Sequence, residues 1–289
     1  MKRVLFIAPQ PFFQWRGSPI RVGFNVQALA ELGYEVDLLT LPIGEKRSTP
    51  GVRVIRVANP FGVKNIPIGP SGHKAVFNAL LFFKAMGLAF ERRYAVIHAV
   101  EEAGAFAWFV AKLTGAKTIF EKHSDPASHK ASPLKNIVLA LYRQFERLSI
   151  RCADAVIGTG EGLCEQARKV SPAKPIHHIF DIPSSLAEPE PARVRKLSTE
   201  LRKHPAEMLV MYVGSFAVYQ GIDLMFESMQ YVLERHPQAR FVIIGGSKAE
   251  IAQREDWLRT RGIDASVTFI GTVPPDELPN YLAAADILL

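Results

Sequence analysis

The chain has 289 residues, of which 48% are apolar and 22% charged, and its 35 Lys and Arg against 28 Asp and Glu give a formal charge of +7. At about 150 residues per domain this length predicts two domains, and the composition excludes a disordered chain and a coiled coil. The cysteines, Cys152 and Cys164, form neither a Cys-x-x-Cys pair nor a metal-ligand cluster, which argues against structural zinc and a disulfide framework and fits a reducing cytoplasm.

The first half of the chain alternates short apolar runs with longer helical patterns. Val4–Ala8 is large and apolar until Pro9, which predicts a buried strand. Apolar residues at spacings of three and four predict a helix over Arg21–Leu32 that Gly33 ends. The other predicted strands are Val36–Thr40, Val52–Val57, Ala95–Ala99, Lys117–Lys122, Ala155–Gly158 and Ile176–Phe180, and the other helices are His73–Phe90, Glu101–Thr114, Leu134–Cys152 and Glu161–Val170. Strands separated by such helices pair in parallel, which predicts a doubly wound α/β sheet.

A change of composition then divides the chain. Ile182–Pro191 holds three prolines among small and acidic residues and has no periodicity, which predicts a linker. Beyond it the predicted strands are Met208–Val213, Phe241–Ile244 and Val267–Ile270, and the helices are Gly221–His236, Ala249–Arg261 and Pro275–Ala284. We therefore expect two Rossmann-like α/β domains, 1–182 and 207–289, with a linker and helix over 183–206. The apolar end, Ala285–Leu289, predicts the start of a buried strand and hence a chain truncated within its second domain.

Charge is unevenly distributed between the halves. Residues 1–183 carry 24 Lys and Arg against 14 Asp and Glu, whereas residues 184–289 carry 11 against 14. The surplus predicts either a polyanionic partner for the first half or simply a soluble surface. The sequence has no basic stripe with interleaved aromatic residues, which is the pattern that would favour nucleic-acid binding. The basic, aromatic segment His73–Tyr94 fits an anionic membrane surface, although it fits a core helix equally well.

Signals for secretion and membrane insertion are weak. The apolar run after Val4 is far shorter than a signal core. Ala75–Phe90 is interrupted by Asn78 and Lys84, and it is shorter than the stretch of about 18 apolar residues that a membrane span requires. We expect a cytoplasmic protein, either soluble or peripheral at the inner face of the membrane.

Ligands of open parallel sheets bind beyond the carboxyl ends of the strands. After the first strand, Gly17 and Ser18 lead into a helix whose amides favour an anion, although a plain capped turn explains them equally well. His123 directly follows another strand, where structural and functional roles are equally supported. No dinucleotide, Walker or Gly-x-Ser-x-Gly motif is present.

Two strand ends of the second domain carry glycines. Gly214 ends one predicted strand, and Gly245 and Gly246 end the next. Each glycine alone is a common turn former. On successive strands of one sheet they would form a backbone cradle for a phosphate-rich ligand.

Several segments together resemble one family. They are Val210–Gly214, Gln220–Leu224, Phe241–Gly246, Val267–Val273 and Tyr281–Asp286, with Glu31–Val36 near the start. In this order the chain resembles family-4 retaining glycosyltransferases of the GT-B fold. The resemblance implies transfer of a sugar from a nucleotide diphosphate donor held between two domains to a glycolipid or polysaccharide acceptor, with no metal and no cofactor besides the nucleotide-sugar co-substrate.

The resemblance also implies roles for individual residues. Gly17 and His123 are the expected catalytic residues, since this loop meets the diphosphate and this histidine touches the sugar hydroxyls. The expected donor-binding residues are Ser18, Gly214, Ser215, Gln220, Gly245, Gly246 and Val273, the last near the nucleobase.

The chain departs from the family at two points. Ser215 and Gln220 stand where the family commonly has an Arg and a Lys that grip the diphosphate, which removes charge assistance from those hydrogen bonds. Arg16 or Arg21 is a candidate source of the missing charge. The Glu-rich donor motif of the family would lie beyond Leu289. An alternative is therefore a non-catalytic or truncated member that binds sugar nucleotides, and a sugar-nucleotide epimerase is a third hypothesis.

Overall fold

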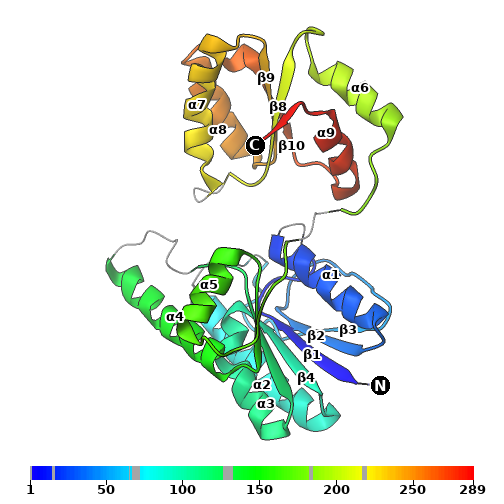
Figure 1. The fold of residues 1–289 in the computed structure, drawn as a ribbon, viewed down its shortest axis with the longest axis vertical. Coiled ribbons are helices and arrows are strands. Elements are labelled where there is room, and N and C mark those ends of the chain that lie inside the picture. The colour runs from blue at the N-terminus through cyan, green and yellow to red at the C-terminus, as the bar shows by residue number, and fades with distance from the viewer. Residues whose placement is uncertain are drawn as a thin grey trace. The chain divides into compact units, whose positions relative to one another are not determined.

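The computed structural model describes residues 2–14, 17–64, 66, 72–125, 133–181, 185–216 and 220–289 (Figure 1). The chain divides into two compact units, Met1–Ile182 and Pro183–Leu289. Each unit is an open α/β structure with its own core, so each is described by itself.

The first unit follows the predicted alternation of strands and helices. Its strands are β1 (Arg3–Ala8), β2 (Glu35–Thr40), β3 (Val52–Arg56), β4 (Val96–Val100), β5 (Lys117–Lys122), β6 (Ala155–Gly158) and β7 (Ile176–His178). Its helices are α1 (Gly17–Glu31), α2 (Gly72–Arg92), the 3₁₀ helix η1 (Glu101–Ala103), α3 (Gly104–Thr114), α4 (Pro133–Cys152) and α5 (Glu161–Val170). Within the described residues, every strand pairs in parallel, in the order β3-β2-β1-β4-β5-β6-β7.

The strand order places a topological switch point between β1 and β4. From β1 the chain continues to β2 on one side, whereas β4 continues to β5 on the other. Connections that diverge from neighbouring strands leave a crevice at the carboxyl edge of such a sheet. The loops that begin after Ala8, Val100 and Lys122 therefore meet at this edge.

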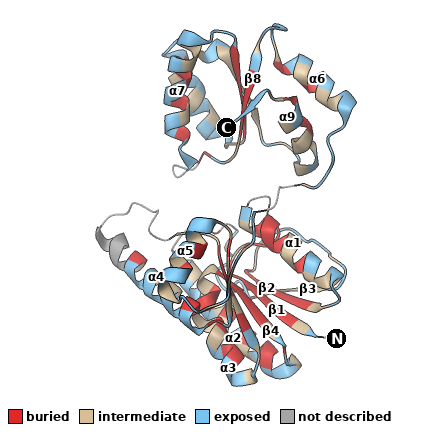
Figure 2. Cartoon of the chain, viewed as in Figure 1, coloured by how far each residue is buried: buried red, intermediate tan, exposed pale blue. Residues whose placement is uncertain are grey.

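The alternation of side chains along β1 supplies both faces of the first sheet. Leu5 and Ile7 pack with α2 and α3, while Phe6 and Ala8 pack with α1. All four are completely buried, as the red strands in Figure 2 show. Helices α2 and α3 lie side by side on their face of the sheet (Figure 1). A strand covered on both faces explains why its sequence is continuously apolar.

The second unit repeats this plan with fewer strands. Its elements are α6 (Pro191–Leu201), β8 (Met208–Val213), α7 (Ile222–Arg235), β9 (Ala239–Ile244), α8 (Lys248–Arg259), the 3₁₀ helix η4 (Asp264–Ser266), β10 (Val267–Gly271), the 3₁₀ helix η5 (Pro275–Glu277), α9 (Leu278–Ala284) and β11 (Ile287–Leu288). The parallel strand order is β10-β9-β8-β11. Helices α7 and α8 cover one face, and α6 and α9 cover the other.

The end of the chain differs from its prediction. Ile287 and Leu288 do form a strand, but they are 43% and 55% exposed rather than buried. The reason is their position at the edge of the sheet, where β8 is the one described strand that pairs with β11. We find no helix in the described parts of the chain with the length and apolar character required to cross a bilayer.

Candidate functional site

The carboxyl edge of the first sheet gathers polar side chains at the switch point. Ser18 lies in the first turn of α1, Glu101 directly follows β4, and His123 directly follows β5. Ser18 Oγ lies 3.1 Å from Nδ1 of His123. The backbone N–H of His123 donates to Oε1 of Glu101 at 2.7 Å. The structure thus brings together residues that are more than 100 positions apart in the sequence.

A fully buried carboxylate, Glu121, is the centre of this cluster. Its Oε1 accepts from Nε of Arg21 at 2.6 Å and lies 3.0 Å from Nε2 of His123. Its Oε2 lies 2.6 Å from Nε2 of His98, and Nδ2 of Asn25 lies 3.2 Å from both oxygens. The carboxylate therefore joins α1, β4 and the end of β5.

These contacts decide the ionisation of Glu121. Burial opposes ionisation, but the hydrogen bonds from His123 and His98 outweigh it and hold the pKa of the carboxyl well below its usual range. An ionised carboxylate only accepts hydrogen bonds. Nε2 of each histidine must therefore carry a proton, which orients the His123 ring so that its Nδ1 faces the hydroxyl of Ser18.

Glu101 is a second carboxyl at the same edge, and its environment acts in the opposite direction. Burial raises its pKa, and the nearby His123 offsets this only in part. Its φ of +50° is unusual for a residue with a side chain. In this conformation the carboxylate accepts from both the amide of His123 and the hydroxyl of Ser124. The strained backbone thus serves to hold the start of the His123 loop.

The suggestion that Arg21 grips the donor diphosphate conflicts with its contacts. Its side chain is only 2% exposed and is paired with Glu121. Its Nη1 donates to the carbonyl of Phe180 at 2.6 Å, and its Nη2 donates to that of Ile179 at 3.0 Å. Arg21 is thus a structural tie between α1 and the segment after β7. Arg16, the other candidate, lies outside the described residues.

In the second unit, the glycines at the ends of β8, β9 and β10 pack directly against one another. A Cβ built on Gly245 would lie 1.9 Å from the carbonyl oxygen of Gly214. Gly245 has φ +120°, and its N–H donates to the carbonyl of Gly271 at 2.7 Å. A Cβ on Gly246 would lie 2.8 Å from the ring of Phe216. Only residues without a side chain permit this close approach.

The other predicted donor-binding residues of the second unit lie around this glycine edge. Ser215 and Gln220 are exposed, and the carbonyl of Ser215 accepts from the hydroxyl of Tyr212 at 2.9 Å. Val273 is partly buried against the core on the α6 and α9 side. The N-terminus of α7 follows Gln220 at Gly221, which has no side chain to cap it. Free amides at such a terminus favour an anion.

Sequence reasoning missed Glu121, Glu101 and Gly271 as members of these clusters. A signal for Glu121 was present, because a carboxylate inside a central strand is costly unless it is paired. His98, inside β4, carries the same signal. The strand alternation alone does not identify the partners of Glu121, which lie on α1, on β4 and directly after β5.

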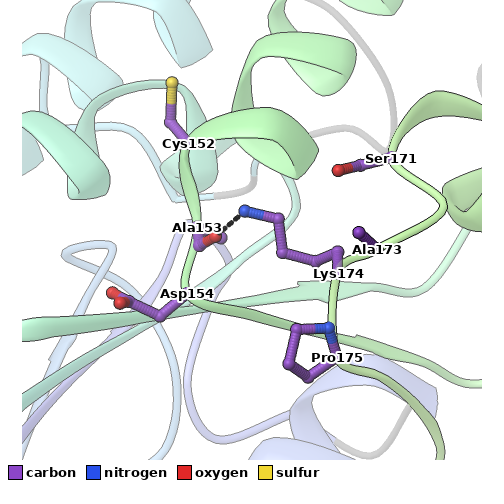
Figure 3. A pocket seen from close by; sticks show the side chains of 7 residues that line it. All are labelled: Cys152, Ala153, Asp154, Ser171, Ala173, Lys174 and Pro175. Atoms are coloured by element: carbon purple, nitrogen blue, oxygen red, sulfur yellow. Dashed lines mark hydrogen bonds between the residues drawn. The ribbon is translucent and has the colours of Figure 1, made fainter.

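A separate hollow of about 390 Å³ lies at the opposite edge of the first sheet (Figure 3). It is lined by residues just before β6 and just before β7, among them Asp154 and Lys174. Lys174 Nζ donates to the carbonyls of Arg151, at 2.9 Å, and Ala153, and thereby neutralises the C-terminal end of α4. This hollow is therefore explained by the structure of the fold and is remote from the strand ends described above.

Comparisons with known proteins agree with this architecture. Residues 17–179 match the model of the glycosyl transferase 4-like domain, and residues 194–289 match that of glycosyl transferases group 1. The chain is 23% identical over 194 residues to alpha-D-kanosaminyltransferase of Streptomyces kanamyceticus, covering 65% of this chain and 50% of that protein. It thus spans half the length of this relative.

Solved structures share the fold. Sucrose-phosphate synthase from Thermosynechococcus elongatus superposes with a TM-score of 0.78 at 22% identity, covering 100% of this chain and 75% of that one. Anabaena HepE, in complex with UDP and glucose, superposes with a TM-score of 0.68 at 15% identity, covering 100% of this chain and 73% of that one. The predicted α/β fold of GT-B type is confirmed.

Proposed function

The chain belongs to the glycosyl transferase 4-like family and carries a group 1 glycosyltransferase domain, and on that basis we propose that it transfers a sugar from a nucleotide diphosphate donor, with retention, to a glycolipid or polysaccharide acceptor. The observation that carries the proposal is the glycine edge of the second unit. There Gly214, Gly245 and Gly271 bring three strand ends into backbone contact, beside the uncapped start of α7.

This edge suits the chemistry of donor cleavage. When the nucleotide departs, the sugar becomes oxocarbenium-like and the diphosphate gains negative charge. Backbone amides that are already fixed in place stabilise such charge without reorganisation, and each 1.4 kcal/mol of added stabilisation accelerates the step about tenfold. A related structure holding UDP and glucose supports a ligand of this class. Gly17, Ser18 and His123 are proposed to contact the diphosphate and the sugar, with Glu121 fixing the His123 ring.

Nucleotide release from a panel of UDP-, GDP- and ADP-sugars tests this proposal. With the full-length gene product and a lipid or glycan acceptor fraction, we expect one donor to release nucleotide and the product to keep the anomeric configuration of the donor sugar. Release is measured by a coupled nucleotide assay, and the configuration is measured by NMR. A folded protein that releases nucleotide from none of these donors would contradict the proposal.

A second candidate function is binding without turnover. The neutral Ser215 and Gln220 favour it, and so does Arg21, whose guanidinium is committed to Glu121. It predicts that UDP or GDP binds, as measured by calorimetry, while no sugar is transferred or hydrolysed. An epimerised sugar nucleotide formed without acceptor would identify the third hypothesis instead.

We further propose that the first unit docks on an anionic membrane surface through the exposed face of α2 and α3. One face of α2 is in the core, through Phe77, Leu81 and Ala85. On its other face Phe83 and Phe90 are 69% and 60% exposed, and aromatic contacts through Phe82 connect Phe83 to Phe109 of α3. An exposed aromatic band of this kind with flanking lysines is typical of interfacial helices.

Only some of the basic residues of this segment are suited to test the docking. Lys74 pairs with Glu102, and Arg92 pairs with Glu35 and Asp37, so reversing either charge would disturb the fold. We therefore predict that Lys84→Glu with Arg93→Glu weakens binding to phosphatidylglycerol vesicles at least about thirtyfold, because each cation near the surface contributes about 1 kcal/mol. Arg195→Glu with Lys196→Glu on α6 is the matched control in a flotation assay. Equal binding by wild type and the α2 variant would refute the docking.

A further inference from the structure

A basic hollow at the carboxyl edge of the first sheet has no role in the function proposed so far. It measures about 370 Å³ and is lined by Lys46, Arg47, Ser48, Val54 and Arg56. The first three lie in the loop after β2, and Arg56 is the last residue of β3. Among the described residues, no acidic side chain contributes to the lining.

Arg56 is the fixed element of this hollow. Its Nη2 donates to the carbonyls of Phe12 at 2.6 Å, Glu45 at 2.7 Å and Gly44 at 3.3 Å. Its Nε is buried without a hydrogen-bond partner, and within the described residues Arg56 forms no ion pair, unlike Arg53 of the same strand, which pairs with Asp37. Carbonyl dipoles hold the guanidinium in position but leave its charge uncompensated. Such a half-buried cation favours an anionic ligand.

The walls of the hollow are held by backbone pairing between two loops. Phe13 and Glu45 exchange N–H···O bonds at 3.2 and 2.9 Å, and the N–H of Phe12 donates to the carbonyl of Ile43 at 3.2 Å. Gly44 has φ +128°, and a Cβ there would lie 2.2 Å from the carbonyl oxygen of Phe12. The guanidinium of Arg47 lies 4.3 Å from the centre of the Phe13 ring, a favourable cation–π geometry.

The same pairing ties the hollow to the edge where the chemistry is proposed. The loop after β1 that includes Phe12 and Phe13 continues toward Gly17 and Ser18 at the start of α1. Fixed guanidinium groups and a hydroxyl match the oxygens of a phosphate ester, which accepts several charge-assisted hydrogen bonds at once.

We propose that Lys46, Arg47, Ser48 and Arg56 form a binding site for a phosphate group, and that the acceptor substrate carries this group. The assignment of the phosphate to an acceptor substrate rests on the proposed transferase function. The phosphate site itself rests only on the lining of the hollow and the contacts of its arginines. The shared ligand chemistry is a phosphate ester, supplied either by a soluble phosphorylated sugar or by a lipid phosphodiester.

Calorimetric titration of the full chain with inorganic phosphate, at constant ionic strength set with chloride, tests the site. We expect saturable binding that is weakened about tenfold or more in Lys46→Ser/Arg47→Ser, because two charge-assisted contacts are lost. Ser48→Asp, which places a negative charge at the hollow and keeps all three cations, is expected to weaken phosphate binding similarly. Arg143→Ser/Arg147→Ser on the exposed surface of α4 is the matched control and should bind as wild type does.

Two further ligands identify the source of the phosphate. Tighter binding of glucose 6-phosphate than of inorganic phosphate indicates a phosphorylated sugar, and tighter binding of monomeric dihexanoyl phosphatidylglycerol indicates a lipid. Absence of saturable phosphate binding, or equal loss in the α4 control, overturns the site. Because this assay requires no turnover, its failure is distinguishable from failure of the transferase proposal, which the nucleotide-release panel measures.

Discussion

Replacing Glu121 by Gln is expected to lower the free energy of unfolding of the first unit by about 3–5 kcal/mol, the range for removing one partner of a buried ion pair. Arg21 would keep its charge at 2% exposure with only the exposed Asp181, 3.4 Å from its Nη1, as a carboxylate partner. Both oxygens of Glu121 now face N–H groups, of Arg21 and of His98. In the Gln variant the amide NH₂ would replace one of these oxygens, so that a donor would face a donor. Denaturant unfolding followed by circular dichroism measures the loss.

The same substitution at an exposed pair is the matched control. Glu35 pairs with Arg3 at 2.6 Å, but both side chains are about two-fifths exposed, and such surface pairs contribute little. We expect Glu35→Gln to unfold almost as wild type does. If both variants lost the same free energy of unfolding, Glu121 would contribute no more than an exposed ion pair does. That result would contradict its role as a buried structural carboxylate.

Acid conditions should reveal the same carboxylate. Since the folded pKa of Glu121 lies well below its ordinary value of 4.5, its ionised form stabilises the fold above that value, and this contribution is lost as pH falls through the folded pKa. The difference in unfolding free energy between wild type and Glu121→Gln should therefore be constant above about pH 5.5 and shrink below about pH 4. A difference that is independent of pH would contradict the low pKa.

Replacing Gly245 by Ala is expected to disrupt the glycine edge of the second unit. The new methyl group would collide with the carbonyl oxygen of Gly214, 1.9 Å from the ideal Cβ position, and the φ of +120° is strained for any residue with a side chain. Overpacking and backbone strain each cost about 1–3 kcal/mol. If the strand end shifts to relieve them, we expect binding of UDP or GDP, measured by calorimetry, to weaken about a hundredfold or more.

Gly262→Ala separates the two causes. Gly262 also has a positive φ, +67°, but no atom lies within 4 Å of an added Cβ. This variant should lose about 1 kcal/mol of stability from backbone strain alone and bind nucleotide as wild type does. Comparable nucleotide affinity in Gly245→Ala and Gly262→Ala would contradict the placement of the donor at the glycine edge.

Most of the fold could be predicted from the sequence because the apolar periodicity agrees with the positions of the glycines and prolines that end the elements. Val4–Ala8 and Lys117–Lys122 are strands as expected, and α5 is a helix within its predicted bounds. Errors arise where tertiary contacts decide the end of an element. The strand predicted to reach Phe180 ends at His178, because the carbonyls of Ile179 and Phe180 accept from Arg21.

The candidate sites could be predicted only in part. Gly214, Gly245 and Gly246 were identified because glycine at a strand end is a local feature, and the structure brings them together. The contact of Ser18 with His123 and the pairing of Arg21 with Glu121 join residues about 100 positions apart. No local sequence pattern identifies such partners. They depend on the order of the strands in the sheet, which decides which strand ends lie next to each other.

We propose that the departing diphosphate lies against the glycine edge and is stabilised by the free backbone amides at the start of α7. Crystals of the full-length protein soaked with UDP or GDP test it most directly. We expect electron density for the pyrophosphate against Gly214 and the Gly245–Gly246 turn, near the start of α7. A nucleotide bound elsewhere, or no nucleotide density at a saturating concentration, would contradict it.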